Sequence, residues 1–232
     1  MDIVLIAGLW LDAQVWDGVA GEIDARGHHP VPVRLPGQDD GNATATLADQ
    51  LDAVLAAVDA AVAAARGPVL VAGHSAACSL AWLTADRRPD AVAAVALIGG
   101  FPTPDGDPYA PFFPIRDGAM SFPGFEPFAG PDTADLDEAT RETMAAAAIP
   151  VPEGVATGVV HLTDARRFDV PVVLVCPEFD PDQARAWIAA GDVPELAKAT
   201  RVSYVDIDSG HWPMITAPAE LARLLVAATG AG

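Results

Sequence analysis

Residues 69–78 read Val69-Leu70-Val71-Ala72-Gly73-His74-Ser75-Ala76-Ala77-Cys78 and predict a strand, a tight turn and a helix. The apolar, β-branched run ends at Gly73, and small residues after Ser75 begin a helical pattern that continues to about Asp86. Gly73 and Ala77 flank Ser75 two positions away on either side, where a bulky side chain would collide with the adjoining strand or helix. The stretch therefore places a hydroxyl at the tip of a sharp turn.

Ser75 has two interpretations. The pattern G-x-S-x-G is that of a nucleophile elbow, here with Ala77 in place of the second glycine, and the strand before it and the helix after it are the context that this motif requires. The alternative is a serine that caps the N-terminus of the helix beginning at Ala76. Other residues have to decide between them.

Length and composition predict one folded α/β domain. The chain has 232 residues, of which 51% are hydrophobic, and this is enough for a sizeable core. Thirteen basic residues against 32 acidic ones give a net charge of −19, which argues against nucleic-acid and anionic-membrane partners. We expect a small-molecule substrate and a monomer or homodimer.

The chain is expected to be cytoplasmic. Its apolar start, residues 1–8, carries Asp2 where a signal peptide would carry positive charge, and no apolar run approaches the length of a membrane span. Cys78 and Cys176 lie in apolar contexts typical of buried free thiols, so no disulfide is expected.

Six apolar segments alternate with helical patterns, which predicts a six-stranded, mainly parallel, doubly wound sheet. The expected strands are residues 2–7, 31–35, 69–73, 91–98, 170–176 and 202–207. Residues 9–17 are expected to lead into a helix that reaches Arg26. Further helices are expected from Thr46 to Gly67-Pro68 and at 76–86, 133–148, 181–190 and 213–228.

Residues 101–165 interrupt this alternation. They are rich in proline and glycine and contain Phe101, Phe112, Phe113, Phe122, Phe125 and Phe128. So long a connection between two strands predicts a lid over the carboxyl edge of the sheet, where ligands bind in open α/β folds. The alternative is a structural excursion whose aromatic rings pack on the core.

A serine nucleophile needs a base, and the base needs a carboxylate to orient it. Asp180 follows the fifth expected strand and is the preferred acid, with Glu178 and Asp182 as alternatives. His211 follows the sixth strand, behind a glycine, and is the expected base. Both come after Ser75 in the order serine, acid, histidine that accompanies this elbow.

Backbone N–H groups must stabilise the oxyanion that forms in acyl transfer. Ala76, directly after the serine, supplies one by its position. The turn after the first strand is expected to supply the other, through the N–H of Leu9. His74 neighbours the serine, but its side chain is expected to point elsewhere.

Together these segments resemble the α/β-hydrolase superfamily, and within it the small cofactor-free esterase and hydroxynitrile-lyase-like group. That group usually has His-Gly in its first loop and a tryptophan eight positions later; Gly8 and Trp16 keep the spacing, but Ala7 replaces the histidine. The superfamily's two leading antiparallel strands are expected to be missing, because the first expected strand begins at residue 2. The resemblance implies one domain over residues 1–232, with residues 101–165 as its lid.

The resulting hypothesis is a serine hydrolase that cleaves a small, largely apolar ester, lactone or thioester through Ser75, His211 and Asp180. No metal or organic cofactor is implied. The alternatives are a non-hydrolytic binding protein on the same scaffold, or a carbon–carbon bond hydrolase or acyltransferase with the same triad. Expected pocket residues are Trp10, Phe101, Phe112, Phe113 and His161.

Overall fold

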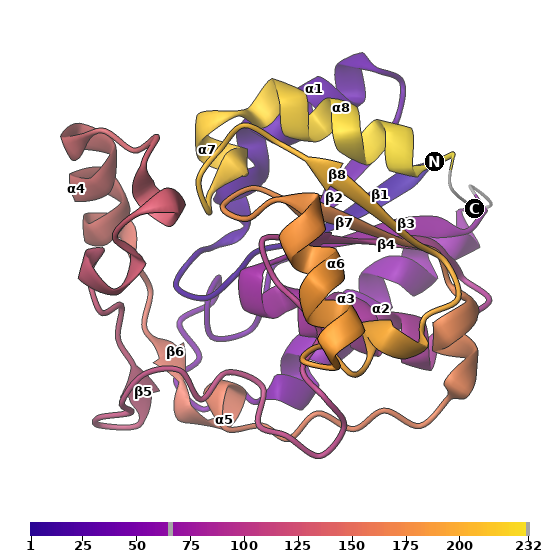
Figure 1. The fold of residues 1–232 in the computed structure, drawn as a ribbon. Helices are drawn as coiled ribbons and strands as arrows, with labels where there is room; N and C mark the ends of the chain where they lie inside the picture. The colour runs from indigo at the N-terminus through magenta and orange to yellow at the C-terminus, as the bar shows by residue number, and fades with distance from the viewer. Residues whose placement is uncertain (65–66, 231–232) are drawn as a thin grey trace.

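A computed structural model describes residues 1–64 and 67–230. Six parallel strands form one sheet in the order β2-β1-β3-β4-β7-β8 (Figure 1). The strands are β1 (Asp2–Ile6), β2 (His29–Pro32), β3 (Val69–His74), β4 (Val92–Ile98), β7 (Val172–Cys176) and β8 (Val202–Asp206). The described residues thus have the predicted six-stranded, doubly wound α/β architecture.

Helices cover both faces of this sheet. One face carries α1 (Asp17–Ala25), α7 (Pro213–Thr216) and α8 (Pro218–Ala228), and the other carries α2 (Leu47–Ala63), α3 (Cys78–Arg87) and α6 (Pro181–Ala190) (Figure 1). Alternate strand residues point to opposite faces, so the core has two halves. Ile3 and Leu5 pack in the half that contains α1 and α8, whereas Val4 and Ile6 pack in the half that contains α2 and α3.

Prolines explain two differences from the expected elements, one at the start of the second strand and one within the last helix. The second strand begins at His29 rather than at Val31, because β2 is an edge strand and an edge tolerates Pro30. The helix expected over residues 213–228 is divided into α7 and α8 at Ala217, because Pro218 lacks the N–H that a continuous helix needs.

Residues 101–165, here called the insertion, leave the sheet after β4 and return before β7. They contain a small antiparallel sheet of β5 (Ala119–Met120) and β6 (Val151–Pro152), with α4 (Glu138–Ala147) and α5 (Glu153–Ala156). Short 3₁₀ turns η3 (Glu126–Phe128) and η4 (Pro131–Thr133) connect β5 to α4. Figure 1 shows α4 standing apart from the helices that cover the sheet. The helix expected to start near Thr133 begins only at Glu138, where Asp137 caps it.

The buried carboxylate of Asp86, near the end of α3, fixes the chain as it returns from the insertion. It accepts hydrogen bonds from the backbone N–H groups of Thr163 and Asp164, both 2.8 Å, and from the buried guanidinium of Arg167.

None of the helices in residues 1–64 and 67–230 is long and apolar enough to cross a membrane.

Candidate active site

Ser75 lies at the sharp turn between β3 and α3 with a left-handed backbone, φ 55°. The turn is tight because two glycines allow close approach: a Cβ on Gly73 would lie 2.2 Å from the carbonyl oxygen of Ala77, and one on Gly100 would lie 2.6 Å from that of Ser75. The short helix η2 (Ser75–Ala77) that opens the turn has no side-chain cap. Ser75 therefore has the geometry of the elbow and not that of a helix cap.

His211 faces this serine from the loop between β8 and α7. Its Nε2 lies 2.9 Å from the Oγ of Ser75. The ring is nearly buried, and residues 75 and 211 meet because both follow parallel strands at the carboxyl edge of the sheet. The structure thus brings the side chains of Ser75 and His211 together at this edge.

The carboxylate next to His211 belongs to Glu178, not to Asp180. Oε1 of Glu178 lies 2.8 Å from Nδ1 of His211, and this carboxylate is half-buried after β7. The other oxygen, Oε2, is buried and has no hydrogen-bond partner among the described residues. Gly99 makes room for the pair, since a Cβ there would lie 3.2 Å from Oε2 of Glu178.

Asp180 was the wrong choice because its carboxylate caps α6. It accepts hydrogen bonds from the N–H groups of Asp182 and Gln183, and the Gln183 side chain accepts from the N–H of Asp180. This capping box is visible in the sequence as Asp180, Pro181 at the first helical position and Gln183 at the third. Asp182 is also excluded, since it lies in the exposed first turn and pairs with Arg185.

His74 was expected to point elsewhere, but its side chain packs behind the site, against His211. Its Nε2 lies 2.7 Å from the carbonyl oxygen of His211, and the two rings lie 4.9 Å apart. Complete burial lowers the pKa of His74 well below its usual range, and the nearby His211 lowers it further. His74 is therefore neutral and donates from Nε2 to the carbonyl of His211.

The insertion fixes the loop that carries His211. The backbone N–H of His211 donates to the carbonyl of Asp132, 2.8 Å, and the N–H of Gly210 donates to Oδ2 of Asp135, 2.8 Å. The Ser209 hydroxyl also donates to Asp135. Burial and the neighbouring Glu178 carboxylate raise the pKa of Asp132. The insertion and the histidine loop thus form one hydrogen-bonded unit.

The turn after β1 lies against the serine. A Cβ on Gly8 would lie 2.7 Å from Nδ1 of His74 and 3.2 Å from Cβ of Ser75, so only glycine allows this approach. Leu9 follows directly, and the N–H of Ala76 lies in the first turn of η2, where it has no intrahelical acceptor. Both N–H groups that the sequence predicted for an oxyanion are therefore on segments that border Ser75.

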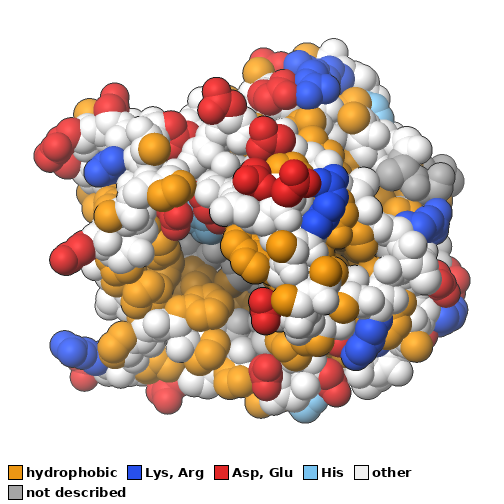
Figure 2. Space-filling model, viewed as in Figure 1, with side chains coloured by type: hydrophobic (Ala, Val, Ile, Leu, Met, Phe, Trp, Pro, Cys, Tyr) orange, Lys and Arg blue, Asp and Glu red, His pale blue; other side chains and the backbone are white. Residues whose placement is uncertain are grey.

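Aromatic rings from the insertion surround Trp10 and extend to the histidine. The Trp10 ring lies 5.6 Å from Phe113 and 5.4 Å from Phe122, and Phe128 stacks beside the ring of His211 at 6.4 Å. Figure 2 shows a hollow between the part of the molecule that carries α4 and the rest, with hydrophobic side chains in its walls. Phe122 and Phe128 belong to this group, although they were expected only as residues of the lid and not of the pocket.

Phe101 packs elsewhere at the same edge, against Phe179 at 5.4 Å and Trp187 at 6.0 Å. Phe112 was a wrong choice, because its side chain is turned to solvent and is 58% exposed. A proline and two phenylalanines follow one another at 111–113, and periodicity cannot tell which ring of such a run is buried.

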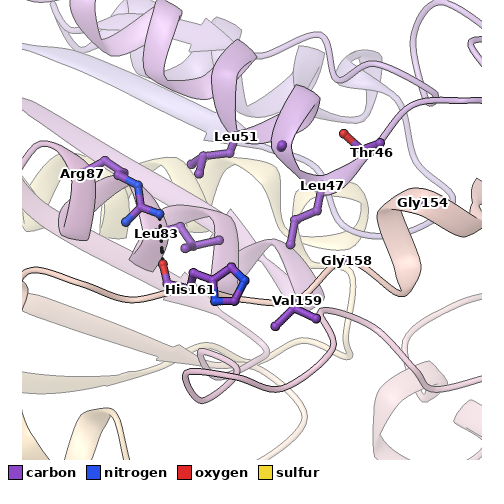
Figure 3. A pocket seen from close by; sticks show the side chains of 10 residues that line it. Thr46, Leu47, Leu51, Leu83, Arg87, Gly154, Gly158, Val159 and His161 are labelled. Atoms are coloured by element: carbon purple, nitrogen blue, oxygen red, sulfur yellow. Dashed lines mark hydrogen bonds between the residues drawn. The ribbon is translucent and has the colours of Figure 1, made fainter.

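His161 also lies apart from Ser75, Glu178 and His211. Its exposed side chain lines a separate cavity of about 250 Å³ between α2, α3 and the end of the insertion, with Leu47, Leu83 and Val159 among its neighbours (Figure 3). Its carbonyl oxygen accepts a hydrogen bond from Arg87. Ser75, Glu178 and His211 do not line this cavity, so placing His161 in the pocket of Ser75 was wrong.

No group of three or more His, Cys, Asp or Glu side chains within residues 1–64 and 67–230 is arranged to hold a metal ion. The arrangement around Ser75 offers a hydroxyl, an imidazole and a carboxylate in hydrogen-bond contact. That set suits nucleophilic attack with general-base assistance.

The model of the alpha/beta hydrolase family matches residues 3–224. The chain belongs to this family. No curated protein sequence matches it. The fold of this family agrees with the position of Ser75, Glu178 and His211 at the carboxyl edge of the sheet.

Solved structures agree on the fold. An extracellular alpha/beta-hydrolase from a Paenibacillus species, described as homologous in structure and function to tobacco salicylic acid binding protein 2, superposes with a TM-score of 0.75 at 21% identity over 98% of both chains. The methylesterase MES16 from Arabidopsis gives 0.76 at 13% identity over 100% of both chains. A pyrethroid hydrolase from Sphingobium faniae gives 0.69 at 20% identity over 100% of this chain and 98% of its own.

Replacing Glu178 tests which carboxylate orients the histidine. Glu178→Gln keeps the shape but removes the negative charge beside Nδ1 of His211, so kcat with p-nitrophenyl acetate should fall roughly 10³- to 10⁴-fold. Asp180→Asn is the matched control: asparagine also caps helices well, so kcat should stay within about threefold of the parent value. A large loss in Asp180→Asn, with near-normal turnover by Glu178→Gln, would reverse the assignment.

The buried neutral His74 predicts a pH dependence of stability. The pKa of His74 is lowered only in the folded protein, so below about pH 6.5 this side chain is protonated in the unfolded chain but not in the folded one. Acidification should therefore lower the free energy of unfolding, by up to about 1.4 kcal/mol per pH unit from this residue. His74→Gln keeps a donor towards His211 and should remove this part of the slope. Urea unfolding of both proteins between about pH 5 and 8 measures it; parallel curves would contradict the assignment.

Proposed function

We propose that the protein is a serine hydrolase that cleaves small, largely apolar esters through an acyl-enzyme intermediate. One observation carries this proposal: Oγ of Ser75 lies 2.9 Å from Nε2 of His211, whose Nδ1 lies 2.8 Å from Glu178. These three groups have the contacts and the order of roles that a triad requires.

In the first half-reaction, Nε2 of His211 takes the hydroxyl proton as Oγ of Ser75 attacks the carbonyl carbon of the ester. The Leu9 and Ala76 N–H groups stabilise the resulting oxyanion. The tetrahedral intermediate collapses, and His211 gives its proton to the departing alcohol. Glu178 keeps the proton of the neutral imidazole on Nδ1 and stabilises the imidazolium that forms.

In the second half-reaction, water replaces the alcohol. His211 takes a proton from this water as its oxygen attacks the acyl carbon, and a second tetrahedral intermediate forms in the same oxyanion site. Collapse breaks the bond to Ser75, returns the proton to its Oγ and releases the carboxylic acid. The enzyme thus ends in the state in which it began.

The walls around the site support an apolar substrate and a lid role for the insertion. Trp10, Phe113, Phe122 and Phe128 form contiguous aromatic surface beside His211. Such rings bury apolar groups of a ligand and exclude water from the reaction. The esterase and pyrethroid-hydrolase names of the structural neighbours favour ester substrates as well.

A cytoplasmic location is part of the same proposal. Cys78 and Cys176 are both free and buried. Burial raises the pKa of the Cys78 thiol far above its usual range and that of Cys176 to about 12, so neither is a reactive thiolate. Unpaired cysteines are ordinary in a reducing compartment.

Turnover of p-nitrophenyl acetate and butyrate tests the function. The parent protein should hydrolyse both, and Ser75→Ala should lower kcat by about 10⁶-fold, because the nucleophile is lost. Ser79→Ala, at the start of α3, is a matched control, since the Ser79 hydroxyl contacts Thr103 and forms no hydrogen bond with Ser75, His211 or Glu178 among the described residues. If the parent protein turns over neither ester and a fluorophosphonate leaves Ser75 unlabelled, a binding protein is the correct interpretation.

A further inference from the structure

Gln38 is a buried amide that holds the turn beside Ser75. Its Nε2 donates to the carbonyl oxygen of Gly8 at 2.8 Å and to that of Leu11 at 2.5 Å. Gln38 is only 4% exposed, and burying a side-chain amide is costly unless its hydrogen bonds are satisfied. Both of its donor hydrogens are used on one short turn, which makes it a clamp on residues 8–11.

The hydrogen bond from Gln38 to the carbonyl of Gly8 also fixes the direction of the N–H of Leu9. The carbonyl of Gly8 and the N–H of Leu9 belong to the same peptide unit, which is planar and trans, so they point in opposite directions. Holding the carbonyl against Gln38 therefore turns the N–H of Leu9 to the other side of the turn. Among the described residues, this N–H has no hydrogen-bond acceptor, so it is available to a ligand.

A second buried amide keeps Gln38 in this orientation. Nε2 of Gln50 in α2 donates to Oε1 of Gln38 at 2.9 Å and to the carbonyl of Pro36 at 2.9 Å. Because Oε1 of Gln38 accepts this bond, its NH₂ group must be the end that faces Gly8 and Leu11. Gln50 is completely buried. The two amides form a relay from α2 to the turn, without any charged group.

Other bonds hold the rest of the turn but leave the Gly8–Leu9 peptide to Gln38. Trp10 has a left-handed backbone, φ 63°; its ring nitrogen donates to the carbonyl of Met120, and its own carbonyl accepts from the N–H of Ile149. Asp39 accepts from the N–H of Ala13. Among the described residues, Gln38 supplies the only hydrogen bond to the Gly8 carbonyl.

We propose that Gln38 is a positioning residue for the oxyanion site, acting by aiming the N–H of Leu9 at the substrate oxygen. This inference rests on the proposed hydrolase function, because that function gives the N–H its task. Among the described residues, Gln38 forms no hydrogen bond with Ser75, Glu178 or His211, so it acts through the peptide unit.

Gln38→Met tests the proposal, because methionine keeps the length of the side chain but cannot hold the Gly8 carbonyl. With p-nitrophenyl acetate, kcat should fall about 10- to 100-fold and KM should change less than about threefold, since the N–H matters most when negative charge develops. The affinity for a short alkyl trifluoromethyl ketone, which forms a tetrahedral oxyanion with the serine, should fall in proportion to kcat/KM. A merely structural role would not produce this proportionality.

Asp39→Asn is the matched control, since Asp39 lies next to Gln38 and accepts from the N–H groups of Ala13 and Leu35 but makes no bond to the Gly8 peptide; its kcat/KM should stay within about threefold. Should Gln38→Met fail to fold by circular dichroism, Gln50→Met removes the relay one step earlier, and its kcat and ketone affinity should fall together. A parent protein that hydrolyses the ester, with folded Gln38→Met or Gln50→Met showing unchanged kcat and ketone affinity, overturns the inference. A parent protein without any ester turnover would instead overturn the proposed function.

Discussion

The left-handed backbone of Ser75 is the constraint on which the site depends. It turns the chain from β3 into α3 within a few residues and so holds the hydroxyl at the carboxyl edge of the sheet. Gly73 and Gly100 are required because any Cβ at either position would overlap backbone atoms. Once the serine is fixed there, the loops after β7 and β8 bring Glu178 and His211 to it because all these strands are parallel.

The local part of this arrangement could be predicted from the sequence. Apolar runs bounded by Gly and Pro gave six strands, and the alternation with helices gave their parallel arrangement. Ser75 and His211 could be chosen because each directly follows a strand. Asp180 shows that a position after a strand is not enough to identify the acid. The Asp180 carboxylate caps α6, and Glu178, two residues earlier, forms the hydrogen bond with His211.

Contacts across long stretches of chain could not be predicted in the same way. Phe112 and Phe128 lie in one proline- and glycine-rich segment without helical or strand periodicity, yet one is exposed and the other stacks beside His211. The position of His161 could not be predicted either, since the fold places it in a separate cavity beside α2 and α3 and not beside Ser75. Gln38 contacts a turn about thirty residues earlier, and nothing in its local pattern indicates that contact.

Detection of the covalent intermediate tests the central claim most directly. A reaction with p-nitrophenyl acetate can be quenched in acid during turnover, and the protein examined by intact-mass spectrometry and peptide mapping. The account predicts a single acetyl group, located on the oxygen of Ser75. Continued hydrolysis with Ser75 unmodified, or an acetyl group on a different side chain, would contradict it.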